Sequence, residues 1–386
     1  MKKVAIVAGD FPVPSETFII NEIRALKQAG HQIVVICFNL LDEQVAQRLD
    51  IEVCQVKDAS RLQTFAAIAK SVTNLAAVHQ YLAVQPQALR KSLLWYGAKI
   101  AAVCQQYQVQ HIHCHFLHHA LSHGLVAKYL LGIKLSAIGH GHDVYQDQNY
   151  LANILPHCDL PIAVCKQMQT DLQQATKVEP RLLPCGIHLA DFPLQPLNLT
   201  ANNKLLFLGR VVEKKGLCYL LDALAAMPTQ SRPKLDIVGN GQLIEAIRAQ
   251  VEQLKLNDTV TFLGFKAHTW LVENIQQYDA LIAPFCIADN GDRDTGPLVL
   301  KEAMALGKPV ITTNIMGCPD IVCQEAGFLV PAKNSQALVQ VLAQFYQMTD
   351  EQRQHMALAA RKRVEEKFNS LLLAKQLSGW IEQECV

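Results

Sequence analysis

The chain has 386 residues, of which 50% are hydrophobic and 18% are charged, and its formal net charge is +1. This length exceeds one typical domain and predicts two. The balance of acidic and basic residues argues against a nucleic-acid-binding protein, which normally carries a basic excess. No apolar run reaches the roughly 20 residues of a transmembrane helix.

The N-terminal apolar run, Val4–Ala8, is too short for a secretory signal peptide and is typical of a first buried strand. The 12 cysteines are scattered without CxxC spacing. In a long chain without a signal peptide, such cysteines are mostly reduced thiols of the core. We therefore expect a cytoplasmic protein.

Short apolar runs alternate with helical patterns along the whole chain, which predicts an α/β architecture with parallel sheets. In the first half, strands are expected at Val4–Ala8, Gln32–Cys37, His111–His115, Leu135–Ile138 and Leu160–Val164, with helices at Glu16–Ala29, Leu62–Leu82, Ala88–Tyr107 and Phe116–Leu131. In the second half, strands are expected at Lys204–Leu208, Lys234–Val238, Val260–Phe262, Ala280–Ala283 and Pro309–Thr313, with helices at Gly216–Ala226, Gln242–Leu254 and Pro297–Leu306.

The segment from Asp191 to Asn203, DFPLQPLNLTANN, interrupts this alternation with two prolines and several polar residues. It is the natural linker between two Rossmann-like domains. We place the first domain at residues 1–192, the linker at 193–203 and the second domain at 204–365.

The segment from Gly291 to Val310, GDRDTGPLVLKEAMALGKPV, carries the most chemical information. Gly296 and Pro297 predict a sharp turn into a helix, with Pro297 as the first helical residue. The amides of Leu298 and Val299 would then face outward at a helix N-terminus, where anions bind readily.

Two carboxylates flank this expected anion site. Glu302 lies on the helix, which Gly307 is expected to close, and Asp294 lies eight residues earlier on the loop. A ligand with both phosphate groups and sugar hydroxyls would suit this arrangement.

The same segment resembles the EGxPxxLxEAMAxGxPV string of retaining nucleotide-sugar glycosyltransferases of family 4. Asp294 stands where the family normally has Glu. The resemblance implies the glycosyltransferase B fold: two Rossmann-like domains with parallel sheets face each other across a cleft, and the C-terminal helix, residues 366–386, packs back on the first domain. It also implies that Glu302 binds the ribose of the donor and that Asp294 binds its sugar.

A second group of candidate residues opens the second domain. Gly209 and Arg210 end a strand, and Lys215 follows before a helix. Fixed cations of this kind stabilise the charge that develops on a departing diphosphate, although a solvated basic turn would look the same. The resemblance assigns Arg210 and Lys215 to the donor diphosphate, and it places two glycine-containing turns, Gly239 with Gly241 and Gly264 with Phe265, against the nucleotide.

In the first domain, Phe11 to Phe18 reads FPVPSETF and resembles the start of transferases that build bacterial exopolysaccharides. Ser15 is expected to be the N-cap of the first helix, with Glu16 and Thr17 in its first turn. Capping alone would explain these residues. The resemblance nonetheless places all three near the acceptor or the cleft.

Histidines gather between His111 and His123. His111, His113 and His115 alternate along one strand and can share one face, which would allow zinc binding. We favour the alternative of a strand end with exposed polar side chains, and we expect no metal ion or other cofactor. The family tolerates an HxHF pattern here without using a metal, and we place His115 at the cleft.

The segment from Ile138 to Tyr145, IGHGHDVY, follows a predicted strand and resembles the THGxD pattern of the family. Ligands of open parallel sheets bind beyond the carboxyl ends of the strands. The resemblance places His140 near the reacting carbon of the sugar and makes it the catalytic candidate of the first domain. Asp143 is its expected neighbour.

The helix expected from Ala88 carries Arg90, Lys91 and Lys99 beside Leu93, Leu94 and Trp95. Such a basic, apolar helix could lie on the inner face of the membrane and reach a lipid-linked glycan. An ordinary half-buried helix would show the same pattern, and we favour it slightly.

These features predict a retaining, metal-independent glycosyltransferase that moves a sugar from a UDP- or GDP-sugar to a hydroxyl of a glycan or lipid-linked glycan in polysaccharide biosynthesis. Two alternatives stay open. One is a non-catalytic relative that binds a nucleotide sugar, suggested by Asp294 in place of Glu. The other is a metal-dependent hydrolase built on the histidines between His111 and His123.

Overall fold

The computed structural model describes the chain except residues 71–73, 147–149, 195–201, 268 and 385–386. The chain forms two compact units. Unit 1 combines Met1–Gly186 with Ser370–Val386, and unit 2 consists of Ile187–Asn369.

Unit 1 is built on a parallel sheet of seven strands in the order β3-β2-β1-β4-β5-β6-β7. The strands are β1 (Lys3–Phe11), β2 (Gln32–Leu40), β3 (Glu52–Gln55), β4 (His111–His115), β5 (Lys134–Gly139), β6 (Leu160–Ala163) and β7 (Arg181–Leu182). The central strands are continuous apolar runs because helices cover both faces of a parallel sheet. Val4 to Ala8 of β1, for example, are all fully buried.

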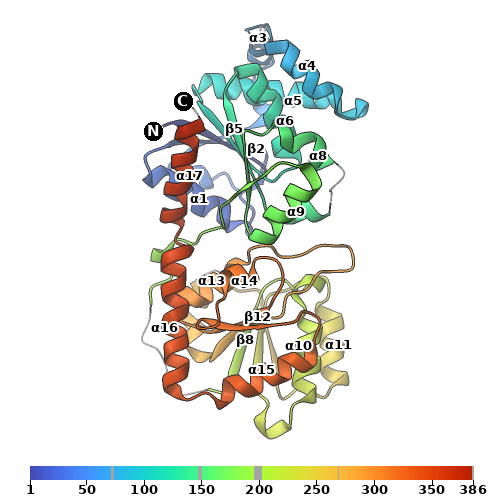
Figure 1. Cartoon of the computed structure of the whole chain (residues 1–386), viewed down its shortest axis with the longest axis vertical. Coiled ribbons are helices and arrows are strands. Elements are labelled where there is room, and N and C mark those ends of the chain that lie inside the picture. Colours follow the sequence, from blue (N-terminus) through green and yellow to red (C-terminus); the bar gives the residue numbers. More distant parts are fainter. Residues whose placement is uncertain (71–73, 147–149, 195–201, 268, 385–386) are drawn as a thin grey trace. The chain divides into compact units, whose positions relative to one another are not determined.

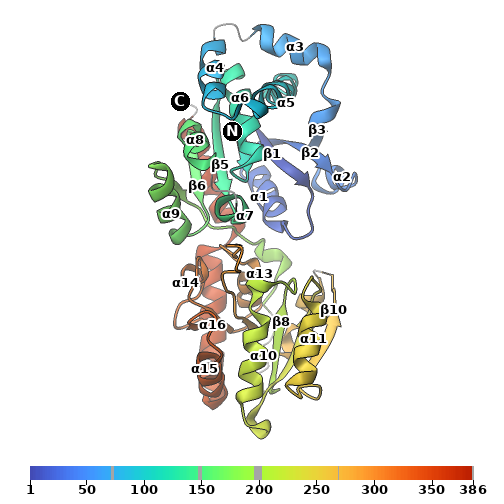
Figure 2. The same ribbon diagram turned by 90° about the vertical axis from the view of Figure 1, so that its right-hand side faces the viewer.

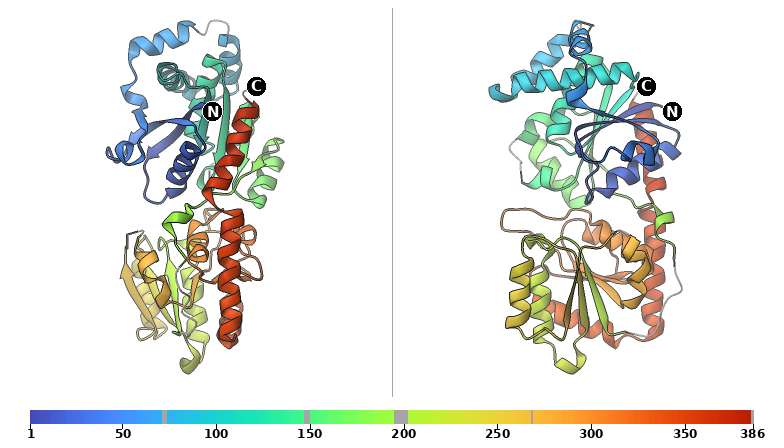
Figure 3. Two further views of the ribbon diagram at one scale, coloured as in Figure 1. Left: turned by 90° about the vertical axis from the view of Figure 1, so that its left-hand side faces the viewer. Right: turned by 180° about the vertical axis from the view of Figure 1, so that it is seen from behind.

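The helices of unit 1 are α1 (Thr17–Gln28), α2 (Val45–Leu49), α3 (Arg61–Lys70), α4 (Leu75–Ala83), α5 (Gln87–Gln106), α6 (His119–Leu131), α7 (His142–Tyr145), α8 (Leu151–Ile154), α9 (Lys166–Thr176) and α17 (Ser370–Glu384). Helix α6 packs on β4 and β5 and also against α5. The final helix, α17, lies along α1 (Figures 1 and 3). The C-terminal segment therefore completes the unit that the N-terminal segment begins.

The two faces of β4 meet different helices because successive side chains of a strand point to opposite sides. Cys114 faces α6: its Sγ atom would lie only 2.7 Å from a Cβ atom added to Gly124 of that helix. His113 and His115 point to the other face, where both contact Glu22 of α1. The alternation expected for these histidines is confirmed.

Unit 2 contains a parallel sheet of six strands in the order β10-β9-β8-β11-β12-β13. The strands are β8 (Lys204–Leu208), β9 (Lys234–Val238), β10 (Val260–Gly264), β11 (Ala280–Ala283), β12 (Val310–Thr313) and β13 (Gly327–Val330). The helices are α10 (Leu217–Ala226), α11 (Ile244–Gln253), α12 (Thr269–Asn274), α13 (Leu298–Ala305), α14 (Cys318–Ile321), α15 (Ser335–Gln347) and α16 (Asp350–Lys367).

Two apolar layers hold this second sheet between its helices. One layer joins the strands to α10, α11 and α15 and includes Leu220, Val251 and Leu342. The other joins them to α13 and α16 and includes Met304 and Val364. Figure 2 shows α10 and α11 beside β8.

Most expected strands and helices are present, several with unchanged bounds, such as β4, β8, β9 and β11. Three short strands, β3, β7 and β13, were missed because each lies at the edge of its sheet and lacks the continuous buried apolar run of a strand such as β11. The single helix expected at Leu62–Leu82 is instead two helices, α3 and α4.

The division between the units falls after Gly186, a few residues before the predicted end of the first domain at residue 192. The chain crosses a second time between Asn369 and Ser370. The two crossings are paired, because Ile187 and Asn369 form an isolated parallel bridge. Most of the linker predicted at 193–203 lies outside the described residues.

None of the described helices is both long and apolar enough to cross a membrane. Every cysteine that the structure describes is a free thiol, as expected for core cysteines.

Candidate active site

The strand order of unit 2 fixes where a ligand can bind. The order reverses between β8 and β11, so the chain leaves these neighbouring strands in opposite directions. The loops that follow such strands diverge and leave a crevice at the carboxyl edge of the sheet. The loop after β8 carries Gly209, Arg210 and Lys215, and the loop after β11 carries Asp294. Residues that the sequence linked only through motifs therefore belong to adjacent loops.

Two lysine–aspartate pairs connect these loops. Lys215 Nζ lies 3.0 Å from Asp294 Oδ2, and Lys214 Nζ lies 3.0 Å from Asp292 Oδ1. Burial raises the pKa of Asp294, but Lys215 and Lys214 outweigh it and lower that pKa below its ordinary value. The Lys215 ammonium also lies 4.8 Å from the centre of the Phe285 ring. Asp294 is thus an ionised carboxylate in a positively charged surrounding.

Lys214 is a site residue that the sequence analysis missed. It is 8% exposed, and its pairing with Asp292 holds the β11 loop against the turn before α10. The sequence signal consisted of two adjacent lysines, Lys214 and Lys215, and two aspartates separated by one residue, Asp292 and Asp294.

The glycines at the ends of β8 and β9 allow two backbones to approach closely. A Cβ atom on Gly239, which has a φ of +134°, would lie 1.9 Å from the carbonyl oxygen of Gly209. A Cβ atom on Gly241 would lie 2.3 Å from the carbonyl oxygen of Val211. Packing between these loops is therefore sufficient to explain both glycines, whether or not a ligand is bound.

The Gly264 turn is different. A Cβ atom there would meet nothing within 4 Å, although the φ of +67° still favours glycine. The next residue, Phe265, is 79% exposed. An aromatic ring beside an open backbone can take part in base or ring stacking.

Helix α13 begins at Leu298, with Pro297 as its N-cap rather than its first helical residue, because the ψ of Pro297 is extended at 120°. The N-cap residue is a proline and makes no side-chain hydrogen bond to the first turn, which includes the amides of Leu298 and Val299. Gly296 lies in the bend before Pro297, and Gly307 follows the helix with a φ of +75°. The expected cap at Gly307 is confirmed.

Two adjacent residues of α13, Lys301 and Glu302, are charged yet buried. Glu302 is 9% exposed. Lys301 is fully buried, with its Nζ atom 3.4 Å from the carbonyl oxygen of Gly296 and 4.9 Å from the centre of the Phe368 ring. Lys301 thereby holds the turn before α13 against the helix.

In unit 1 the strand order reverses between β1 and β4, and the loops after β1, β4 and β5 carry the remaining candidates. The N-cap of α1 is Glu16, not Ser15 as predicted, and the Glu16 side chain makes no capping hydrogen bond. The cause is a turn closed by a 2.9 Å hydrogen bond from the Glu16 amide to the carbonyl of Val13, which leaves Ser15 exposed before the cap. Thr17 is the first residue of the helix.

His140 follows β5 in a densely packed position. Its Nε2 atom lies 3.0 Å from His115 Nδ1, and its ring stacks on Phe18 with the centroids 4.1 Å apart. Burial, and next the neighbouring His115, lower the pKa of His140 well below its usual value. His140 is therefore a neutral imidazole at pH 7.

Asp143 acts on the backbone around His140. Its carboxylate accepts hydrogen bonds from the amides of His140 (3.0 Å), Gly141 (2.9 Å) and Leu117 (2.7 Å). It is fully buried, so it holds the loop after β5 against the loop after β4. Asp143 is a positioning residue for His140, which is consistent with its expected place beside it.

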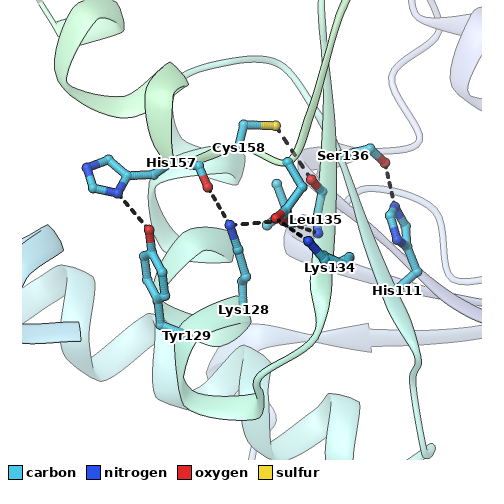
Figure 4. A network of polar contacts seen from close by, with 9 residues as sticks. His111, Lys128, Tyr129, Lys134, Leu135, Ser136, His157 and Cys158 are labelled. Carbon is cyan, nitrogen blue, oxygen red and sulfur yellow. Dashed lines mark hydrogen bonds and ion pairs between the residues drawn. The ribbon is translucent and has the colours of Figure 1, made fainter. Parts of the chain in front are cut away.

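The strand histidines are buried, which corrects the interpretation of an exposed strand end. His111, His113 and His115 are 0%, 0% and 1% exposed. Ser136 Oγ lies 2.7 Å from both His111 Nε2 and His113 Nδ1, and Figure 4 shows the first of these contacts beside a polar network on β5 and α6.

Glu22 of α1 completes this group and was not recognised in the sequence. Burial raises the pKa of Glu22, but the adjacent imidazoles of His113 and His115 outweigh it and lower that pKa well below its ordinary range. Its signal would have been an acidic residue on the helix that covers the face of β4 shared by these histidines.

Helix α5 has less basic surface than its sequence suggests. Lys99 is 8% exposed, and its ammonium donates a 2.7 Å hydrogen bond to the carbonyl of Lys57. Arg90 donates to the carbonyls of Ala83 and Gln85. These contacts favour a half-buried helix. Beside it, a cavity of about 180 Å³ is lined by apolar residues such as Leu93, Leu117 and Ile154 together with His118 and His123.

Two family profiles match the chain and together cover most of it. The profile of glycosyltransferase family 4 matches residues 15–191, and that of glycosyl transferases group 1 matches residues 194–363. WcaL of Escherichia coli K12, named for colanic acid biosynthesis, is 25% identical over 98% of this chain and 99% of its own length. The amylovoran biosynthesis glycosyltransferase AmsK of Erwinia amylovora is 30% identical over 51% of this chain and 47% of its own length.

Solved structures share the fold over the whole chain. HepE from Anabaena, crystallised with UDP, superposes with a TM-score of 0.74 at 19% identity, covering 99% of this chain and 100% of that one. Sucrose-phosphate synthase from Thermosynechococcus elongatus gives a TM-score of 0.74 at 20% identity and covers 99% of each chain. With two parallel sheets, the carboxyl-edge loops and these profiles, the chain has the glycosyltransferase B fold and belongs to glycosyltransferase family 4.

Proposed function

We propose that the protein is a retaining glycosyltransferase that takes a sugar from a nucleoside diphosphate, UDP or GDP, and transfers it to a hydroxyl group. The observation that carries this proposal is the ionised Asp294 beside Lys215, where the loops after β8 and β11 meet. A carboxylate suits sugar hydroxyls, and the neighbouring cations suit a diphosphate. The solved structures of HepE with UDP and with UDP-glucose are consistent with such a donor.

Each donor residue then has a separate task. Lys215 and Arg210 neutralise the negative charge that develops on the leaving diphosphate. Stabilising such developing charge is usually the largest single contribution to catalysis. The first amides of α13, including those of Leu298 and Val299, add donors at a helix N-terminus. Glu302 binds the ribose, and Asp294 binds the transferred sugar. In this scheme the lysine and arginine side chains supply the positive charge, with no metal at the diphosphate.

We propose that the anomeric configuration of the sugar is retained because the acceptor hydroxyl attacks from the same face that the diphosphate leaves. A phosphate oxygen takes the proton of the acceptor hydroxyl. His140 is neutral, because burial lowers its pKa. It can therefore donate a hydrogen bond near the reacting carbon without adding a positive charge. Asp143 holds the backbone of this histidine in place through three amides.

We infer that the acceptor is a glycan or a lipid-linked glycan of polysaccharide biosynthesis, bound through unit 1 at the inner face of the cytoplasmic membrane. The names of WcaL and AmsK support this class of product. The largely apolar cavity beside α5 could hold the apolar part of a lipid-linked acceptor. Comparing turnover with a short soluble glycan and with its lipid-linked form tests this, and equal turnover would count against the lipid.

Titration calorimetry with UDP, GDP and ADP tests the donor site. One nucleotide should bind clearly better than the others, and its affinity should persist in EDTA. Lys215→Met should weaken binding at least about tenfold, the equivalent of 1.4 kcal/mol. Lys362→Met provides the matched control, since Lys362 is a 74% exposed side chain on α16 of the same unit.

The results separate the remaining alternatives. Binding without turnover in any acceptor screen would favour the non-catalytic relative. Failure of every nucleotide to bind would overturn the donor site itself. The two glycosyltransferase profiles, which match residues 15–191 and 194–363, count against the alternative of a metal-dependent hydrolase.

A further inference from the structure

Three side chains of unit 1, outside the donor site of unit 2, converge on one point. Glu22 Oε1 lies 3.0 Å from His113 Nε2 and 3.1 Å from His115 Nε2. The three atoms all lie within 4.8 Å of one another. A zinc ion with ligands at roughly 2.0–2.2 Å keeps neighbouring ligand atoms roughly 3.0–3.4 Å apart. The two oxygen–nitrogen separations therefore match those of atoms that share an ion.

The same three atoms have no partners other than one another. Within the described part of the chain, Glu22 Oε1, His113 Nε2 and His115 Nε2 are buried, and each contacts only the other members of this group. Buried polar atoms are normally paired, and leaving them unpaired destabilises a protein. One bound cation would satisfy all three at once.

The opposite nitrogen of each imidazole is already engaged. His113 Nδ1 lies 2.7 Å from Ser136 Oγ, which also contacts His111, and His115 Nδ1 lies 3.0 Å from His140 Nε2. Histidines that bind metal ions typically donate their other ring N–H to such a partner, which fixes the ring and its tautomer. Ser136 and His140 occupy these supporting positions.

A small cavity borders Glu22, although His113 and His115 do not line it. The cavity, of about 20 Å³, is lined by Glu22 and His140, together with Phe18, Cys185 and residues of α17. This volume suffices for one water molecule. Three protein ligands and one water are a frequent set for zinc.

We propose that Glu22, His113 and His115 bind one divalent transition-metal ion, with zinc as the first candidate. The ion joins α1 to β4 across the face of the sheet where both histidines point. Imidazole and carboxylate ligands suit zinc and its neighbours in the first transition series. This proposal departs from the expectation of no metal, and it is independent of the proposed donor site, whose lysine pairs it leaves unchanged.

Metal binding also gives His115 a defined role. With Nε2 on the ion, Nδ1 carries the proton and donates it to His140 Nε2. His140 then carries its own proton on Nδ1, the atom that faces Cys185 Sγ at 3.7 Å. The ion would thus set the tautomer of the candidate catalytic histidine without contacting the substrate.

Metal analysis of the purified full chain tests the proposal. The wild type, grown with added zinc and passed through a desalting column, should carry about one equivalent of metal. Glu22→Gln and His115→Ala should each reduce this content at least fivefold. The matched control is His123→Ala: it removes a buried histidine of the same unit that bonds to the carbonyl of His119, outside the triad.

A second measurement does not depend on how the variants fold. Wild-type protein stripped with a chelator should take up one equivalent of Co²⁺ with the d–d absorption of a nitrogen and oxygen site, and Zn²⁺ should raise its unfolding temperature. No metal after purification, together with no Co²⁺ spectrum and no Zn²⁺ shift, would overturn the proposal. Metal content that is equal in the wild type, Glu22→Gln and His115→Ala would overturn it too, because the ion would lie elsewhere. UDP binding by the stripped protein is expected to be unchanged, which separates this outcome from a failure of the donor site.

Discussion

At the scale of single residues, the loops after β8 and β11 pair opposite charges that stabilise each other. Asp294 is partly buried and ionised because Lys215 and Lys214 lower its pKa against the effect of burial. The same lysines are thereby held in place before any phosphate arrives. A site with its charges positioned in advance avoids the cost of ordering long side chains during binding.

Asp294→Asn should separate sugar recognition from nucleotide recognition. It removes the proposed contact with the transferred sugar but leaves Lys215 able to meet the diphosphate, so turnover should fall at least about tenfold, or 1.4 kcal/mol, while UDP affinity should hold or rise. Steady-state kinetics and UDP calorimetry on one preparation check this. Asp294→Glu, which restores the residue usual in the family, should keep most activity. Unchanged turnover in Asp294→Asn would show that the carboxylate serves only the lysines.

Lys308, between α13 and β12, should make stability depend on pH. It is 4% exposed, and burial lowers its pKa from 10.5 to about 8, with a partial opposing effect of Asp279. Below pH 8 the folded and the unfolded chain both carry the proton on Lys308. The destabilisation that comes from burying this charged ammonium is then fully present. Between pH 8 and 10.5 the unfolded chain binds more protons, so stability rises with pH by up to ~3 kcal/mol.

Lys308→Met should therefore stabilise the protein at pH 7 and gain less at pH 10. Urea unfolding at the two pH values measures this, with Lys362→Met as the exposed control. An equal gain at both pH values would mean that the effect is apolar packing and not protonation.

At the scale of elements, the site is assembled by loops that follow neighbouring strands. Gly239 and Gly209 illustrate this, because the turn after β9 touches the backbone of the turn after β8. Each turn consequently depends on the other for its shape. The shape of these two turns therefore depends on the pairing of β8 with β9 and not on the sequence of either turn alone.

Gly239→Ala should disturb this pair strongly. The added methyl group would lie 1.9 Å from the Gly209 carbonyl oxygen, so we expect a loss of roughly 2–4 kcal/mol in the stability of unit 2 and weaker nucleotide binding. Gly264→Ala is the control, since it shares a positive φ but meets no atom within 4 Å. It should cost about 1 kcal/mol. Equal losses in the two variants, measured by calorimetric unfolding, would show that backbone conformation alone decides the effect.

Many of the strands, helices and turns were predictable from the sequence, because continuous apolar runs and glycine turns are local signals. Strands such as β8 and β11 and the cap at Gly307 are encoded within a few neighbouring residues. The cap of α1 was misassigned because the hydrogen bond from Glu16 to Val13 moves the helix start by one residue. Glu22 and Lys214 were missed because their partners, His113 and Asp292, are far away in sequence. Pairing across elements becomes visible only once the strand order is known.

At the scale of the whole molecule, the last helix belongs to the unit formed by the first residues. Helix α17 packs on α1, with Ala374, Leu377 and Ile381 nearly or fully buried. Unit 2, in contrast, is one continuous segment, Ile187–Asn369. Unit 1 is therefore built from two separate segments of the chain, whereas unit 2 is built from one.

Leu377→Ala should lower the stability of unit 1 by roughly 2–5 kcal/mol, as expected for a fully buried leucine. Leu372→Ala, at a 46% exposed position of the same helix, should change it by at most about 0.5 kcal/mol. Calorimetry with and without the preferred nucleotide would assign the transitions, since the nucleotide should stabilise unit 2. A Leu377→Ala effect on the nucleotide-sensitive transition would contradict this assignment.

Proton NMR of the sugar released from the nucleotide donor is the most direct test of the proposed sugar transfer with retention. Once calorimetry has identified the nucleotide, the enzyme is incubated with the corresponding α-linked sugar nucleotide and an acceptor, or with water alone for slow hydrolysis. We expect the first anomeric signal of product or free sugar, before mutarotation, to be α, and we expect this signal to be lost in Asp294→Asn. A first signal from the β anomer would contradict the proposed retention, and release that persists unchanged in Asp294→Asn and Lys215→Met would contradict the proposed site.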